Sequence, residues 1–236
     1  MAGQAAGFVL LLVAACTMQA AQGYSRTTGM AKTTRYWDCC KPACSWRSNA
    51  GDVKNPVRTC AAGGVRTLDE NEQNGCTGGS SFVCNNQRPF VKDGQAYAFA
   101  AANLNGLPIS SLCCTCYKLT FTDTSLAGEN LIVQVTNTGS DLDNNHFDLM
   151  IPAGGEGIYT QGCPAQWPDY ENSVWGEQYG GVTSRDKCDA LPSNLVDGCR
   201  FRFDWFKGAN NPHAKFERIA CPSILSAISR CKRNDD

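Results

Sequence analysis

The stretch Thr34-Arg35-Tyr36-Trp37-Asp38-Cys39-Cys40-Lys41-Pro42-Ala43-Cys44-Ser45-Trp46 carries one carboxylate, three large aromatic side chains and three cysteines. Cysteines that form disulfides would pin the backbone beside Asp38 to distant parts of the chain. The flat faces of Tyr36, Trp37 and Trp46 are surfaces of the kind on which sugar rings stack. A rigidly held carboxylate beside aromatic rings therefore indicates a site for carbohydrate chemistry.

Each of these side chains also has a purely structural interpretation. Asp38 is equally typical of a turn or capping residue that precedes a Cys-Cys pair. Trp37 and Trp46 are also of the kind that fills a hydrophobic core. The local sequence leaves both interpretations open.

Residues 1–23 contain no charged side chain, and the apolar run 8–15 is followed by small and polar residues, which is typical of a secretory signal peptide. Cleavage near its end would remove Cys16 and reduce the 15 cysteines of the chain to an even number, enough for seven disulfides. A lipoprotein signal with a lipidated Cys16 is the alternative, but the segment has no basic residue. We expect a secreted, extracellular protein.

Residues 24–236 have the length of one domain, and no Pro/Ser/Thr-rich linker leads to a separate carbohydrate-binding module. The formal net charge is -1 with mixed signs, so neither nucleic acid nor a membrane surface is an expected partner. No other stretch approaches the roughly 20 apolar residues of a membrane helix. We expect a single catalytic domain that acts as a monomer.

Gly, Asn, Pro and Ser interrupt the chain at short intervals, which favours short strands joined by turns. Alternating runs predict strands over five segments, namely 117–122, 131–136, 146–151, 200–206 and 216–220. Dense alanine predicts a helix over 95–102, and a second short helix is expected near 222–229.

In the expected strand 146–151, His146 and Asp148 share one face, and Phe147 and Leu149 lie on the opposite, apolar face. A carboxyl group beside apolar surroundings keeps its proton near neutral pH, as a general acid must. An aspartate that simply faces solvent is the alternative. The polar loop 137–145 before this strand is either a solvated connection or a segment that closes over substrate.

Two cysteine clusters, within 39–44 and 113–116, resemble metal-ligand groups at first sight. Adjacent cysteines do not match common zinc spacing, the chain has only His146 and His213 as histidines, and secretion favours disulfides. We therefore expect no metal and no other cofactor. The chain also lacks the Gly-x-Ser-x-Gly motif of a serine nucleophile.

The string from Thr34 to Pro42, TRYWDCCKP, closely resembles the signature of glycoside hydrolase family 45, a family of small secreted endoglucanases. The resemblance continues at 113–117, 145–152, 179–181, 202–206 and 211–212, and so covers nearly the whole mature chain. It implies a fold dominated by β-structure. The expected fold is a six-stranded double-psi β-barrel with long disulfide-tied loops, a few short helices and an open groove.

The family hydrolyses internal β-1,4-glucosidic bonds of cellulose or related β-glucans with inversion, so the resemblance implies a β-glucan substrate. It implies Asp38 as general base, Asp148 as general acid and Asp141 as an assisting loop residue. The implied substrate-binding residues are Thr34, Tyr36, Trp37, Trp46 and His146.

The family's disulfide pattern, carried over to this sequence, uses fourteen cysteines. The implied pairs are Cys39-Cys163, Cys40-Cys76, Cys44-Cys113, Cys60-Cys84, Cys114-Cys231, Cys116-Cys221 and Cys188-Cys199.

The chain departs from the family at Ala153, where a glycine is usual, and Asp143 and Glu156 add carboxylates near the loop and the acid. If position 153 needs a positive φ, we expect the turn that follows the segment of Asp148 to differ in shape from the family's. The two carboxylates receive no catalytic role.

A non-hydrolytic wall-binding protein of the expansin or barwin type, which has the same kind of barrel, is the second functional hypothesis. Such proteins lack the Tyr-Trp-Asp segment that supplies the base, and this chain has both carboxylates. A small cysteine-rich toxin or inhibitor is disfavoured by the length of the chain. The sequence leaves the preferred polymer open.

Overall fold

The structure is a computed structural model, and it describes residues 27–236. The expected signal peptide over residues 1–23, with Cys16, lies outside the described residues. Within residues 27–236, no helix combines the length and the apolar composition that crossing a bilayer requires.

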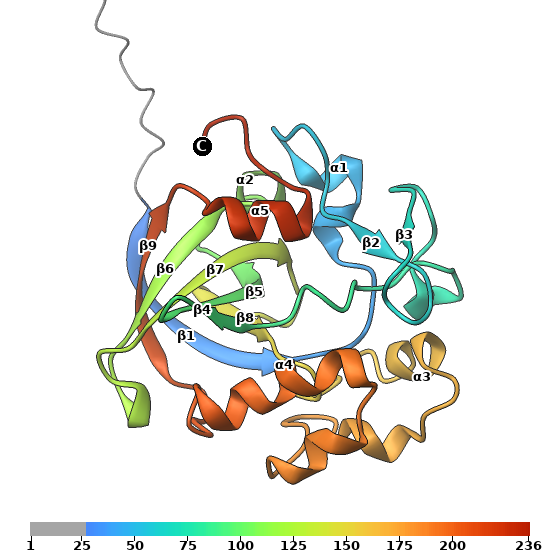
Figure 1. Cartoon of the computed structure of the whole chain (residues 1–236). Coiled ribbons are helices and arrows are strands. Elements are labelled where there is room, and N and C mark those ends of the chain that lie inside the picture. Colours follow the sequence, from blue (N-terminus) through green and yellow to red (C-terminus); the bar gives the residue numbers. More distant parts are fainter. Residues whose placement is uncertain (1–26) are drawn as a thin grey trace, which may run out of the picture.

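Six strands close into a barrel (Figure 1). The hydrogen-bonded order is β5-β7-β6-β9-β1-β8, and β8 pairs again with β5 to complete the circle. A short seventh strand of this sheet, β4, pairs with the first residues of β5. The last residues of β5 pair with β8. The strands are β1 (Thr28–Tyr36), β2 (Thr59–Cys60), β3 (Thr67–Leu68), β4 (Phe90–Lys92), β5 (Gln95–Asn103), β6 (Cys116–Phe121), β7 (Asn130–Asn137), β8 (His146–Met150) and β9 (His213–Ile219).

The barrel has two parallel pairs, β1 with β8 and β5 with β7, and its remaining pairs are antiparallel. A single apolar cluster fills it, in which Leu119, Val133, Phe147 and Leu149 are fully buried. The expected six-stranded double-psi barrel is thus confirmed, and so is the assignment of Phe147 and Leu149 to the core.

Short helices lie around the barrel, with α4 along one side and α5 at one end (Figure 1). The α-helices are α1 (Arg47–Ala50), α2 (Ile109–Leu112), α3 (Gly162–Gln166), α4 (Ser193–Asp204) and α5 (Ser223–Ser229). The 3-10 helices are η1 (Ala43–Ser45), η2 (Gly75–Thr77), η3 (Thr124–Leu126), η4 (Asn172–Trp175) and η5 (Asp186–Ala190).

Four of the five strands expected from alternation are confirmed, as β6, β7, β8 and β9, and α5 confirms the helix near residue 222. The helix expected over 95–102 is wrong, because these residues form β5. Ala96, Ala98 and Ala100 alternate into the barrel core, while Phe99 packs in a second cluster outside it. Small side chains fit the crowded interior, and this packing overrides the helix propensity of alanine.

The strand expected over 200–206 is also wrong, because this segment lies at the end of α4 and just beyond it. Its alternation of charged and aromatic residues has the period of a strand. The rings of Phe201 and Trp205 nevertheless stack with centroids 5.1 Å apart, at the four-residue spacing of a helix. The disulfide Cys188–Cys199 joins α4 to η5.

Seven disulfides tie the loops to the barrel and to each other. They join the same pairs that the family resemblance implies: Cys39-Cys163, Cys40-Cys76, Cys44-Cys113, Cys60-Cys84, Cys114-Cys231, Cys116-Cys221 and Cys188-Cys199. Five of them close loops of more than 30 residues, which in the chain-entropy view are the most stabilising kind.

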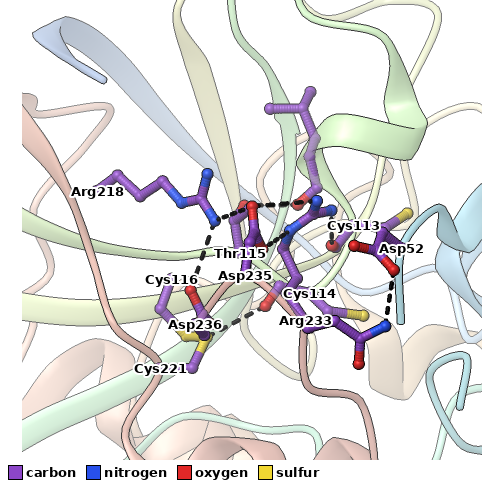
Figure 2. Close-up of polar contacts among 12 residues, drawn as sticks. Asp52, Cys113, Cys114, Thr115, Cys116, Arg218, Cys221, Arg233, Asp235 and Asp236 are labelled. Carbon is purple, nitrogen blue, oxygen red and sulfur yellow. Dashed lines mark hydrogen bonds and ion pairs between the residues drawn. A yellow bond between two sulfur atoms is a disulfide. The ribbon is translucent and has the colours of Figure 1, made fainter. Parts of the chain in front are cut away.

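Ion pairs hold the last residues of the chain against β9 and the loop before β6 (Figure 2). Arg218 of β9 contacts Asp235 at 3.1 Å and Asp236 at 3.5 Å. Arg233 pairs with Asp235 at 2.6 Å and donates to the carbonyl oxygen of Cys113. Because both guanidinium groups are largely buried, these charges depend on their partners, and loss of one partner would destabilise the fold.

Ala153, where the resemblance places a glycine, adopts the left-handed region with φ 54°. The turn behind β8 therefore does need a positive φ there, and alanine adopts it at a cost of about 1 kcal/mol. The carbonyl oxygen of Ala153 accepts a hydrogen bond from the amide of Val182. A Cβ atom at Gly181 would lie 1.8 Å from this oxygen, so the turn and the segment 180–182 are packed backbone to backbone.

We expect Gly181→Ala to destabilise the protein much more than Gly63→Ala. Both glycines have positive φ, but a Cβ atom at Gly63 meets nothing within 4 Å. Gly63→Ala should therefore cost only the backbone term of about 1 kcal/mol. Gly181→Ala should cost about 1–3 kcal/mol more for the clash. Urea unfolding measures both, and equal losses would show that the backbone contact at Ala153 is unimportant.

Candidate active site

The parallel pairing of β1 and β8 places candidate site residues of the two strands side by side. In this register Thr34 of β1 lies opposite Asp148 of β8. The Thr34 hydroxyl donates a hydrogen bond of 2.5 Å to Oδ1 of Asp148. The expected shared face of His146 and Asp148 is confirmed, because Nε2 of His146 lies 2.7 Å from the same hydroxyl.

The hydrogen bonds around His146 determine its tautomer. The amide of Asp143 is a donor and lies 3.3 Å from Nδ1, so Nδ1 accepts and the hydrogen of the neutral ring is on Nε2. Nε2 then donates to Thr34, whose own hydrogen is free for Asp148. Burial lowers the pKa of His146, in keeping with a neutral ring. A polar chain thus runs from the loop backbone to the Asp148 carboxyl.

The environment of Asp148 favours its protonated form. Burial, together with the nearby charges of Asp141 and Asp38, raises the pKa of Asp148 to about 7. The hydrogen bond from Thr34 and the charge of Arg35 act in the opposite direction but are weaker. Asp148 therefore keeps its proton at slightly acid pH, as a general acid requires.

Asp38 lies two residues beyond the end of β1 and is held by a tight turn. Its Oδ1 accepts a hydrogen bond of 3.0 Å from the amide of Cys40, while Cys39 between them has φ 63°. Disulfides then anchor both cysteines, to Cys163 and Cys76. The turn interpretation of Asp38 is thus correct and does not exclude a chemical role. Burial raises the pKa of Asp38 to about 6.

Both carboxyl groups line one groove. It consists of two adjoining hollows of about 350 and 400 Å³, whose shared walls include Tyr36, Asp141 and Asp148. Asp38 and Trp46 line only the first hollow, which we call the Asp38 half, and Thr34 and His146 line only the second, which we call the His146 half. A groove open at the surface suits a polymer that enters from the side.

Of the three aromatic residues expected to bind sugar, Tyr36 and Trp46 line the groove and Trp37 does not. Trp37 is only 1% exposed and packs in the core outside the barrel, so it has no free face for a sugar, contrary to the expectation. Tyr36 lines both hollows, and its hydroxyl accepts a hydrogen bond of 2.9 Å from Asn137. Trp46 lines the groove, and the ammonium group of Lys41 lies 3.2 Å from its ring centroid. This cation–π contact holds the ring in place.

Asp141 lies on the exposed loop between β7 and β8 and lines both hollows. Its negative charge raises the pKa of Asp148 and that of Asp38. The structure thus brings Asp141 to the same groove as the two aspartates, and its assisting role stays a prediction.

Sequence reasoning gave no role to several residues that the structure places at the site. Arg35 donates a hydrogen bond of 2.9 Å to the side-chain oxygen of Asn210, and its positive charge lowers the pKa of Asp148. Asn137 joins Tyr36 to the backbone amide of Ala43. Arg35 lies inside the TRYWDCCKP signature, but the signature alone gives it no role, and Asn137 has no distinctive sequence signal. The roles of both depend on contacts between segments far apart in the chain. Tyr159 and Tyr179 line opposite halves of the groove and are exposed.

Comparison with known proteins identifies the family. The sequence model of glycosyl hydrolase family 45 matches residues 28–232. The chain belongs to glycosyl hydrolase family 45. Family membership makes it a glycoside hydrolase, and the two groove carboxylates are the groups that such an enzyme needs.

Several proteins named as endoglucanases are similar over most of this chain. An endoglucanase of Cryptopygus antarcticus is 55% identical over 207 residues, which is 88% of this chain and 91% of that protein. An endoglucanase of Phaedon cochleariae is 45% identical, covering 86% and 84%. A putative endoglucanase type K of Fusarium oxysporum is 48% identical over 90% of this chain, which spans only 56% of that protein.

A solved structure shares the fold. The crystal structure of the cellulase from the Antarctic springtail Cryptopygus antarcticus superposes with a TM-score of 0.84 at 54% sequence identity. The match covers 89% of this chain and 100% of that one. The overall fold is therefore shared with a solved cellulase.

We expect Thr34→Val to raise the pKa of Asp148 by about 1, because a hydrogen bond to the ionised carboxyl is lost while the volume is kept. Titration of the carboxyl carbon resonance by NMR measures it. Thr34→Ser retains the hydroxyl and is the matched control. An unchanged pKa in the valine variant would mean that the hydroxyl does not stabilise the carboxylate.

Proposed function

We propose that this chain is a secreted endo-β-1,4-glucanase that cleaves internal bonds of cellulose or a related β-glucan with inversion. The observation that carries the proposal is the pair of groove carboxyls, Asp38 and Asp148, whose pKa values burial raises to about 6 and about 7. The pKa of Asp148 is the higher of the two, as the proposed roles of acid and base require. The weaker acid, Asp148, holds a proton to donate, and Asp38 loses its proton first.

In the proposed mechanism Asp148 protonates the glycosidic oxygen as the bond to the anomeric carbon breaks. Asp38 takes a proton from the water that attacks the opposite face of that carbon. The ionised base is populated above about pH 6 and the protonated acid below about pH 7. Activity should therefore be highest at pH values between these two.

Inversion is the mechanism of the family that the sequence resembles, and it sets a geometric requirement on the two aspartates. Asp148 lies opposite Thr34, and Asp38 is four residues further along the same segment, so the carboxyls are offset rather than adjacent. An inverting pair needs about 6.5–9.5 Å between its carboxyls, against about 5–5.5 Å for a retaining pair, to admit the attacking water. Asp141, on its loop at the groove, would assist by holding the acid's proton through its charge.

The residues around the pair supply substrate contacts in this proposal. Tyr36 and Trp46 would contact glucosyl units, and Thr34 and His146 would orient the acid and the sugar beside it. The names of the relatives, endoglucanase and cellulase, support cleavage within a β-glucan chain. Seven disulfides support an extracellular location, because such bonds persist in oxidising compartments.

We expect Asp38→Asn and Asp148→Asn each to lower kcat by at least about 100-fold on soluble carboxymethylcellulose, because each removes one half of the proton transfer. Reducing-end release measures this. Full activity in either variant would remove that residue from the mechanism.

The same variants provide a folding control. Because the folded pKa of Asp148 exceeds the ordinary value of 3.8, the folded state holds this proton more tightly, and stability falls as the pH rises from about 4 to about 7. Asp148→Asn removes that loss and should melt several degrees higher than the wild type at pH 8. A lower melting temperature there would indicate misfolding rather than lost chemistry.

We expect hydrolysis of a cello-oligosaccharide to release the α-anomer first, because water attacks the face opposite the leaving group. Proton NMR during the first minutes, before mutarotation, distinguishes the anomers. An initial β-anomer would contradict the roles given to Asp38 and Asp148.

A further inference from the structure

A fourth carboxyl group, that of Glu156, lines the Asp38 half of the groove together with those of Asp38, Asp141 and Asp148. Glu156 follows the turn after β8, and its position is set by the hydrogen bond of 2.7 Å from the Trp37 amide to the Gly155 carbonyl oxygen. This bond brings Glu156 next to Asp38, and both line the same hollow. Glu156 is only 4% exposed, and none of the catalytic steps above uses it.

The Glu156 carboxyl lacks the partners that a buried carboxyl normally has. Its Oε1 is buried, and no residue within 27–236 forms a hydrogen bond or an ion pair with it. A buried polar atom without a partner is costly, and such costs persist where function needs them. The charge that contributes to its pKa is that of Asp38, which repels the ionised form of Glu156.

Several other polar side chains that line this hollow have protein partners. Lys41 donates to the carbonyl oxygens of Glu70 and Glu72, at 2.6 and 2.9 Å. Asn49 donates to the carbonyl oxygen of Ala43, and Asn74 accepts from the Lys41 amide. Glu156 thus differs from these neighbours in having its hydrogen-bonding capacity unused.

The protonation state of Glu156 suits a neutral hydroxyl ligand. Burial, with the Asp38 charge as a smaller contribution, raises the pKa of Glu156 to about 7. A protonated carboxyl both donates and accepts a hydrogen bond, and a sugar hydroxyl does the same. Trp46 in the same hollow offers the apolar ring that a glucosyl unit packs against.

We propose that Glu156 binds a hydroxyl group of the glucosyl unit held in the Asp38 half of the groove, and so helps to determine substrate specificity. The inference rests on the proposed glucanase function. The substrate hydroxyl would supply the hydrogen-bond partner that the carboxyl lacks in the free protein. Burying the carboxyl without a partner destabilises the free protein, and this is the cost of holding it in position for substrate.

The test compares Glu156→Leu and Glu156→Gln with the wild type, using cellohexaose as substrate and thermal melting as a second measurement. Leucine has a similar size but makes no hydrogen bonds, and glutamine keeps a donor and an acceptor. Glu171→Leu is the matched control, because Glu171 is exposed and lies outside the groove.

We expect Glu156→Leu to raise KM about tenfold, the effect of losing one good hydrogen bond, with a smaller change in kcat. The same variant should melt a few degrees higher, because the unpartnered oxygen is gone. Glu156→Gln should raise KM by less than leucine does, and Glu171→Leu should leave KM and kcat as in the wild type.

A KM within twofold of the wild type in Glu156→Leu would overturn the inference, whatever its melting temperature. Equal KM increases in the glutamine and leucine variants would also overturn it, because hydrogen bonding would then not be the cause. If Glu156→Leu does not fold, the glutamine variant and Glu156→Met provide the same comparison. A wild type that releases no reducing ends from any β-glucan would instead refute the proposed function.

Discussion

The parallel pairing of β1 with β8 is the constraint on which the site depends. It places Thr34 opposite Asp148 and directs the chain beyond β1 into the turn that carries Asp38. The first half of β1 pairs with β9, so this strand connects β9 and β8 in the barrel wall. The last residues of β1 line the groove. A slip of one residue in the register would turn Asp148 into the core.

Disulfides make this placement rigid on the Asp38 side. Cys39 and Cys40 follow Asp38 directly and connect it to two loops, at Cys163 and Cys76. Asp148, by contrast, is held by a barrel strand and by hydrogen bonds that run through Thr34 and His146. The two carboxyls are therefore fixed by different means, and neither requires a metal or a bound cofactor in the proposed mechanism.

The groove concentrates carboxyl groups at an energetic cost. Burial raises the pKa of Asp38, Asp148 and Glu156 alike, so each is less stable in its charged form than in the unfolded chain. Fourteen half-cystines and a filled barrel offset that cost elsewhere. Such a division between a stable scaffold and a strained site is common in enzymes.

The sequence by itself determined the family and the barrel, because the TRYWDCCKP signature around Asp38 and the matching segments along the chain are long and specific. It also singled out Asp38 and Asp148 as candidate catalytic residues, and those roles stay predictions. It misjudged residues 95–102 and 200–206, where propensity and alternation compete with packing that local sequence does not contain. Only the tertiary structure decided that Trp37 is core and that Glu156 is an unpartnered groove carboxyl. Burial and hydrogen bonding depend on segments distant in the chain, so no local pattern reports them.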